Sequence, residues 1–447
     1  MRSVRGLPVS LSTDLPITER PTRVRYLVVA ALCIAAAVAY IQRNSYGGAE
    51  TTIRADLHLT PAQTGDAASL FFLLYAVLQA PAGWLAQRVG PRSTIVCCAA
   101  GWSVALALCA FAVTPYTLIG GRLLMGVFQA GLLPSATIIL AAWLPPTQRG
   151  TASGLLNSFM LIGGALNANF TGLLLDPLGW RGLFLLYSIP GLIWALLFVV
   201  WFRNRPADHP AVNDAELAVI GEGQAIDDPA AVVRRPVSWA ILLSGALYCI
   251  CLQQFFRAGA NRFADQWLPT YLQEGRHVGK ELANQLTSLP QWGGVIGGFV
   301  GGLLSDWLLA RTGSRGVARK GLAVASLVGC MALYAVAYVV PDVTLAMVLF
   351  SVAMLVFFFS ATCAYAITMD MGGRNLGVVF GLMNMAGNFG AYAFTAVVPR
   401  LNDHYKGDWT ATLVLFAAMH VAALVFWLPL DPNGVIGERE PVPEPKE

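Results

Sequence analysis

Long apolar segments alternate with short polar ones along most of this chain, and each apolar segment is about as long as a membrane crossing requires. A helix needs roughly 20 apolar residues to span the hydrocarbon core of a bilayer. Because lipid offers the backbone no hydrogen bonds, such segments form helices, and their long unalternated runs exclude a transmembrane barrel. The pattern predicts twelve membrane-spanning helices, at 25–47, 66–87, 93–113, 117–142, 151–174, 181–202, 238–272, 288–310, 320–340, 343–369, 377–400 and 409–430.

A long polar segment divides these spans into two sets of six. It holds acids, prolines and paired arginines. Six spans return the chain to the side of the membrane from which it started, so we expect an all-α membrane protein built from two parallel six-helix halves. The expected parts are a cytoplasmic N-tail (1–24), an N-terminal bundle (25–202), a cytoplasmic linker (203–237), a C-terminal bundle (238–430) and a cytoplasmic C-tail (431–447).

An internal repeat supports this division. The segment 83–87 (GWLAQ) is echoed by the segment 302–306 (GLLSD), and the segment 149–157 resembles the segment 374–384. Both offsets are close to half the length of the chain. Two parallel halves with a site between them are typical of transporters.

Composition and charge narrow the class of protein. Of the 447 residues, 56% are hydrophobic and only 12% are charged, whereas soluble domains carry about 25% charged residues. These values exclude a soluble enzyme, a disordered chain and a nucleic-acid binder. If both termini are cytoplasmic, nineteen of the 29 lysines and arginines lie on the cytoplasmic side and six outside, which agrees with the positive-inside rule.

The remaining four arginines fall within the predicted spans: Arg43, Arg122, Arg257 and Arg262. A charge inside the membrane is unfavourable and marks a functional site by default. A cavity lined by arginines suits a carboxylate or a phosphate, which can accept paired hydrogen bonds. The alternative for each arginine is an ion pair or a carbonyl partner that holds helices together. Substrate binding is favoured for Arg43, both roles stay open for Arg122 and Arg257, and Arg262 is expected to pair with Asp265 one turn later.

Uncharged polar side chains within the spans are weaker candidates. Gln129 lies two turns after Arg122 on the same helix face. Tyr75, Asn384 and Asn388 could contact a substrate or form hydrogen bonds between helices. Asn388 is the better site candidate of the two asparagines, because neighbouring glycines leave space around it.

The sequence contains no phosphate-binding loop, no serine–histidine arrangement and no ligand-spaced metal cluster. We therefore expect no catalytic residue, no metal, no cofactor and no nucleic-acid partner. The expected partners are a small organic anion and the lipid bilayer, and we expect the protein to act as a monomer.

At these residues the chain resembles the major facilitator superfamily. The segment 83–92 resembles the superfamily's signature between spans two and three, with Gln87 where an acid is usual, and the second copy keeps Asp306. Within that superfamily the chain is similar to the anion:cation symporters, which include carriers of sugar acids, glutamate and sialic acid. The segments that carry this similarity are 40–44, 122–134, 180–216, 267–272 and 381–388.

The resemblance implies secondary active or facilitative transport of a small organic anion, a sugar acid or other carboxylate, by alternating access in the cell membrane. It assigns gating and structural roles to the motif residues Gly83, Arg88, Gly90, Arg92, Gly302 and Asp306. The expected substrate-binding residues are Arg43, Tyr75, Arg122, Gln129, Arg257, Asn384 and Asn388. Two other hypotheses stay open: a membrane sensor that keeps the carrier fold without transport, and a carrier of a neutral solute.

Coupling is where the chain departs from the pattern that the resemblance implies. Proton-coupled members have acids at the positions of Gln42 and Gln129, and glutamine cannot exchange a proton. The expectation from sequence is therefore a weak or absent dependence of uptake on an imposed pH gradient.

Overall fold

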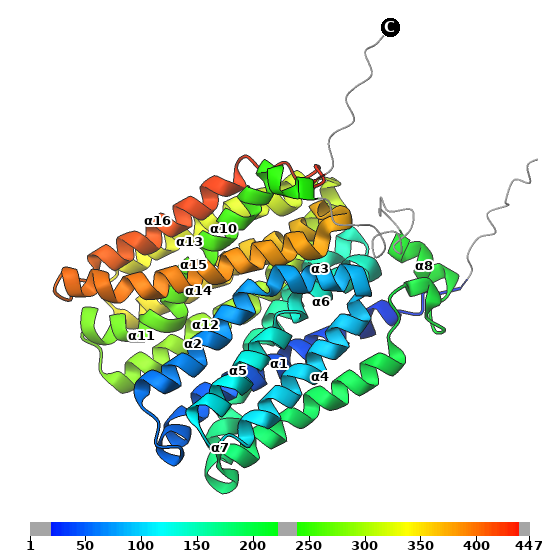
Figure 1. Ribbon diagram of the computed structural model, residues 1–447. Coiled ribbons are helices and arrows are strands. Elements are labelled where there is room, and N and C mark those ends of the chain that lie inside the picture. The colour runs from blue at the N-terminus through cyan, green and yellow to red at the C-terminus, as the bar shows by residue number, and fades with distance from the viewer. Residues whose placement is uncertain (1–18, 222–238, 438–447) are drawn as a thin grey trace, which may run out of the picture.

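The computed structural model describes residues 19–221 and 239–437, which are almost entirely helical (Figure 1). The helices of the first half are α1 (Val24–Asp56), α2 (Pro61–Val77), α3 (Gln79–Val89), α4 (Pro91–Ala110), α5 (Pro115–Gln129), α6 (Leu132–Trp143) and α7 (Pro146–Trp201), followed by α8 (Asp214–Gly221). Those of the second half are α10 (Gly245–Arg262), α11 (Leu268–Thr270), α12 (Lys280–Thr312), α13 (Leu322–Val339), α14 (Val343–Met371), α15 (Leu376–His404) and α16 (Thr410–Trp427). Three π-helical turns complete the second half: η3 (Phe263–Trp267), η4 (Tyr271–Gly275) and η5 (Gly316–Gly321).

The helices account for all twelve predicted spans. Eight helices in the described ranges are long and apolar enough to cross a membrane, and α2 with α3, bent by 48°, make a ninth. Helix α7 contains two spans, because Gly179 takes a φ of 63° and interrupts it between the predicted segments. The more polar α10 and α15 complete the twelve, and the predicted fold class is confirmed.

Short polar motifs set the turns between spans. Thr114 and Thr117 form a reciprocal capping box at the start of α5, and Pro115 occupies the first helical position. This arrangement satisfies backbone donors that the first turn would otherwise leave unpaired. Gly90 ends α3 with a φ of 106°, which only glycine adopts readily, and Pro91 begins α4 directly after it.

Two spans differ from their predicted bounds. Helix α1 continues to Asp56 instead of ending at 47, because Ala49 and Ile53 beyond the predicted end are fully buried in an apolar cluster. The seventh span begins at Gly245 instead of 238, and the π-helical turns η3 and η4 lie after it. The polar composition of these segments gave no signal of either feature.

The linker contributes a structural contact that its composition did not predict. Helix α8 places Glu216 against the start of α1, where its carboxylate accepts hydrogen bonds from the backbone N–H groups of Val24 and Arg25, each at 3.0 Å. Burial alone would raise the pKa of Glu216, but these donors and the hydroxyl of Thr22 hold it below its ordinary value. The rest of the predicted linker (222–237), most of the N-tail and residues 438–447 of the C-tail lie outside the described residues.

The two halves lie side by side, coloured blue to green and green to red in Figure 1. Hydrogen bonds between them gather at the end where α1 begins and α16 ends, which we call the closed end. Asp370 of α14 pairs with Arg149 of α7 at 2.9 Å and with Arg319 of η5 at 3.3 Å. Arg319 also pairs with Asp306 of α12 at 2.9 Å. Both arginines are buried inside the protein, so their charges have a structural role at this end.

The repeated motifs make equivalent contacts at the closed end. Asp306 accepts hydrogen bonds from the backbone N–H groups of Gly150 and Thr151, the fifth and sixth residues of α7, at 3.0 and 2.6 Å. Gln87 accepts one from the backbone N–H of Val378 in the first turn of α15, at 3.1 Å. Each motif of one half therefore binds the backbone near the start of a helix of the other half.

Removing one acid of the closed end should destabilise the protein. The Asp370→Asn variant leaves buried Arg149 without an anionic partner, and breaking a buried pair in this way costs roughly 3–5 kcal/mol. We expect thermal unfolding of the purified protein to show a loss of this order. The matched control is Asp56→Asn, which breaks a half-exposed pair with Arg181 and should change stability by less than about 1 kcal/mol. Equal losses in the two variants would contradict this account of the closed end.

Candidate functional site

A cavity of about 590 Å³ lies between the two halves. Helices α1, α2 and α7 line it from the first half, and α10, α12, α14 and α15 from the second, together with η3. On α15 the cavity begins at Asn384, eight residues and ~12 Å from the closed end. The cavity therefore occupies the middle of the bundle, beyond the closed end, and both halves contribute polar side chains to it.

Arg43 is the main charge that the first half presents to this cavity. Its side chain is 7% exposed, and its guanidinium lies 4.5 Å from the ring centre of Tyr40 and 4.2 Å from that of Tyr75. Its Nε donates a 2.8 Å hydrogen bond to Gln129 Oε1, whereas its buried Nη2 has no partner among the described residues. No described acid lies within ion-pair distance of Arg43. The guanidinium is thus held in place, while its Nη2 remains available for further hydrogen bonds.

Tyr75 and Gln129 act on Arg43 and do not themselves line the cavity. The ring of Tyr75 covers one side of the guanidinium, a favourable cation–π arrangement. Gln129 is fully buried, and its Nε2 donates to the carbonyl of Ala39 at 3.0 Å while its oxygen accepts from Arg43. Both residues therefore fix the orientation of the arginine.

Arg122 lies behind Arg43 and also stays out of the cavity lining. It is 2% exposed, its Nε donates to the carbonyl of Ala67 at 3.4 Å, and one guanidinium nitrogen lies 3.5 Å from the carbonyl of Arg43. The ring of Phe71 lies between the two cations, 4.4 Å from Arg122 and 5.5 Å from Arg43. Arg122 thus adds positive potential behind the site and supports α1.

The second half presents Arg257, Asn384 and Asn388 to the cavity, as the sequence indicated. Arg257 is 8% exposed, and its Nε donates to Gln254 at 3.0 Å. Asn384 donates to Gln79 of α3 at 2.8 Å, so it joins the halves as well as lining the cavity. Arg43 and Arg257 therefore face one space from opposite halves.

The expected pair of Arg262 with Asp265 is present, with Nη1 3.7 Å from Oδ2. Both residues also line the cavity, whereas the sequence indicated only their pairing. The sequence analysis also missed several polar lining residues: Tyr40, Asn44, Gln254, Asn261, Gln291 and Tyr365. Tyr40 and Asn44 flank Arg43 at helical spacing, a signal that could have found them.

The motif residues lie away from the cavity. Gly83 approaches Gly377 so closely that an added Cβ would lie 2.0 Å from its carbonyl oxygen, and Gly302 meets Gly150 in the same way at 2.4 Å. Arg92 receives support from Asn204, which accepts its backbone N–H at 3.0 Å. Arg88 is exposed and lies over the ring of Trp84. The glycines and Asp306 thus form the closed end, whereas Arg88 and Arg92 flank it.

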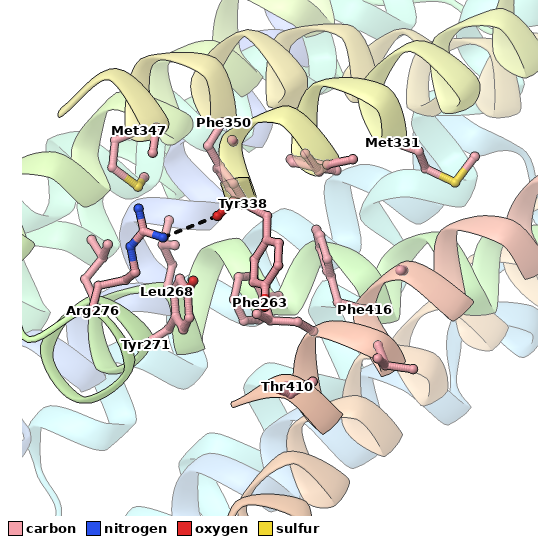
Figure 2. A pocket seen from close by; sticks show the side chains of 18 of the residues that line it. Phe263, Leu268, Tyr271, Arg276, Met331, Tyr338, Met347, Phe350, Thr410 and Phe416 are labelled. Carbon is pink, nitrogen blue, oxygen red and sulfur yellow. Dashed lines mark hydrogen bonds between the residues drawn. The ribbon is translucent and has the colours of Figure 1, made fainter. Parts of the chain in front are cut away.

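A second cavity of about 380 Å³ lies within the second half alone (Figure 2). Aromatic and apolar side chains from η3, η4, α13, α14 and α16 line it, among them Phe263, Phe350 and Phe416. Arg276, the one charged side chain among the described residues of its lining, donates to the carbonyls of Tyr338 and Val340. Within the described ranges the lining includes no residue of the first half, so the central cavity is the better candidate for a transport site.

Comparison with known proteins agrees with this architecture. The chain is 29% identical over 388 residues to the probable sulfoacetate transporter SauU of Cupriavidus necator, covering 86% of this chain and 89% of that protein. It is 29% identical to the D-galactonate transporter of Escherichia coli, covering 93% and 98%. It is 31% identical to the probable galactarate/D-glucarate transporter GudP of Escherichia coli, covering 70% and 72%.

Solved structures show the same fold at low sequence identity. The outward conformation of the transporter FucP matches with a TM-score of 0.68 at 16% identity, covering 91% of this chain and 99% of that one. The proton:xylose symporter XylE matches with a TM-score of 0.68 at 13% identity, covering 93% and 98%. The family model described as Major Facilitator Superfamily matches residues 32–395. The chain therefore belongs to the Major Facilitator Superfamily, and it is a multi-pass membrane transporter rather than an enzyme.

Proposed function

We propose that this protein carries a small organic anion, a sugar acid or other carboxylate, across a cell membrane by alternating access. The observation that carries the proposal is Arg43, a buried guanidinium in the cavity between the halves with an unpartnered Nη2 and no acid beside it. A buried cation in this state is stabilised when an anion occupies the cavity. The names of the relatives, which refer to sulfoacetate, galactonate and glucarate, support the same class of substrate.

The proposed orientation places both termini and the closed end in the cytoplasm. The excess of lysine and arginine in the segments that flank this end supports it. The central cavity would then face the outside and receive substrate from there. Rearrangement of the closed-end contacts would open the cavity inward, with residues 25–202 and 238–430 moving as two bundles within a single monomer.

Each half contributes one arginine to the proposed anion site. Arg43 would hold a carboxylate with its free N–H groups, positioned by Gln129 and Tyr75. Arg257, whose Nε is held by Gln254, would meet a second anionic or polar group at the other end of the substrate. Asn388 of α15 lines the same cavity and offers an amide to substrate hydroxyls.

Replacing Arg43 should weaken anion binding. Hydrogen bonds to a charged group contribute about 1.5–3 kcal/mol, so Arg43→Ala should weaken the affinity for a sugar acid by roughly 10- to 100-fold. Uptake of labelled D-galactonate, D-glucarate and sulfoacetate into liposomes that contain the purified protein measures the effect. Arg181→Ala, which removes a half-exposed arginine far from the cavity, serves as the control. Undiminished uptake by the Arg43 variant would refute the site assignment.

Replacing Arg257 should discriminate between substrates by charge. A dianion such as D-glucarate can engage both arginines, whereas a monoanion such as D-galactonate engages Arg43 first. Arg257→Gln should therefore weaken the binding of D-glucarate by about tenfold more than that of D-galactonate, because one charge-assisted interaction is lost. Ligand-induced thermal stabilisation of wild-type and variant protein, with neutral sugars as a further arm, measures this difference. An equal effect on both acids would count against a second anion subsite.

A further inference from the structure

We propose that Asp265 couples transport of the anion to a proton, and that its protonation releases Arg262 to hold the incoming substrate. The proposal rests on the function proposed above and adds its driving ion. It replaces the expectation of pH independence that Gln42 and Gln129 suggest when they are considered alone.

Asp265 is the one acid among the described residues that line the central cavity. It lies on η3, a π-helical turn of a type that is rare and often found at functional sites. Its partner Arg262 lines the same cavity, with 3.7 Å between Nη1 and Oδ2. Both side chains keep about a third of their surface exposed, at 37% and 27%. A pair this long and this accessible is weak, so a proton or an anion can compete for either partner.

The groups around Asp265 favour a proton over a metal ion. Its Oδ2 accepts a 2.8 Å hydrogen bond from Asn261 Nδ2, and its Oδ1 accepts one of 3.3 Å from Gln291 Nε2 of α12. Two amide nitrogens thus donate to the carboxylate, and the described residues contain no group of three or more acidic, histidine or cysteine side chains that could hold a metal ion. The charged or titratable groups within electrostatic range are Arg262 on the same segment and Tyr40 on α1, and Gln291 is neutral.

The glutamines of the first half leave this acid as the available proton carrier. The amide of Gln42 donates to the carbonyl of Tyr187 at 2.7 Å, and that of Gln129 donates to Ala39 while its oxygen accepts from Arg43. These contacts hold α1 in place, and neither side chain exchanges a proton. If a proton accompanies the anion, the group that binds this proton is therefore another residue of the cavity.

Binding of the two ions is linked through charge. An anion beside Asp265 favours the protonated form of its carboxyl group, and the linkage is reciprocal, so a proton on Asp265 strengthens anion binding. In the proposed cycle, a proton from outside binds a carboxylate oxygen, the pair with Arg262 separates, and the guanidinium N–H groups donate to the anion. When the cavity opens to the other side, the anion and the proton leave to water, and Arg262 pairs with Asp265 again.

The position of η3 suits a movable element. Asp265 faces the central cavity, while Phe263 of the same turn lines the second cavity shown in Figure 2. The segment therefore lies between two cavities, and close packing does not surround it on all sides. A change in the Arg262–Asp265 pair can shift this segment with a smaller loss of packing contacts than in a filled core.

The experiment compares two modes of transport in liposomes that contain wild-type protein or the Asp265→Asn variant. The first mode is exchange of labelled D-galactonate for unlabelled D-galactonate at equal pH, and the second is uptake driven by an acidic exterior. We expect the pH gradient to raise wild-type uptake at least fivefold. Asp265→Asn should lose the stimulation, because its side chain stays neutral at every pH, while measurable exchange at equal pH shows that the variant is folded. Asp403→Asn, at the end of α15, should keep both activities, and Asp265→Glu should keep the stimulation.

Three results would overturn the inference. The first is a wild type that exchanges anion but does not respond to the pH gradient. The second is an Asp265→Asn variant that keeps the full stimulation. The third is uptake that a sodium gradient drives and the pH gradient does not. Each leaves the proposed function standing. A wild type that exchanges none of the three acids would instead overturn the proposed function and this inference with it.

Discussion

A buried cation without an acid beside it is the constraint on which the rest of this structure depends. Arg43 lies in the middle of the membrane-spanning bundle, where charge is poorly solvated. The protein holds it with the rings of Tyr40 and Tyr75 and with the oxygen of Gln129, but not with a carboxylate. These contacts stabilise the cation partly and orient it, and its remaining hydrogen-bonding capacity faces the space between the halves. The cavity is therefore suited to a ligand that brings the missing negative charge.

The buried arginines of the closed end show how the protein stabilises a charge whose role is structural. Arg149 and Arg319 are as deeply buried as Arg43, yet Asp370 and Asp306 pair with them directly. Those four residues join the halves at one end, where Gly83 and Gly302 allow the backbones to meet. Arg43 and Arg257 at the cavity have no such ion pair among the described residues. This contrast distinguishes the arginines that join the halves from those proposed to bind substrate.

Much of this architecture could be predicted from sequence, because a bilayer imposes length and apolarity on every span. The twelve segments, the two halves and the pair of Arg262 with Asp265 followed from local pattern. What could not be predicted depends on contacts between distant segments. The pairing of Arg149 and Arg319 with Asp370 depends on how separate helices pack, and the place of Asp265 in the cavity lining depends on the π-helical turn η3. Glu216 likewise gave no sign in the linker that it would cap α1. The sequence pattern shows which charged residues fall within spans. Only the packing of the helices shows which of those residues form ion pairs.

The central claim is that the cavity selects its ligand by negative charge. Equilibrium binding of D-galactonate and of its uncharged counterpart galactitol to the purified protein tests it most directly, because both are open chains that differ chiefly in the carboxylate. If Arg43 binds that carboxylate, loss of the charge-assisted hydrogen bonds should make galactitol bind roughly 100-fold more weakly. Equal affinities for the acid and the neutral polyol would contradict the account.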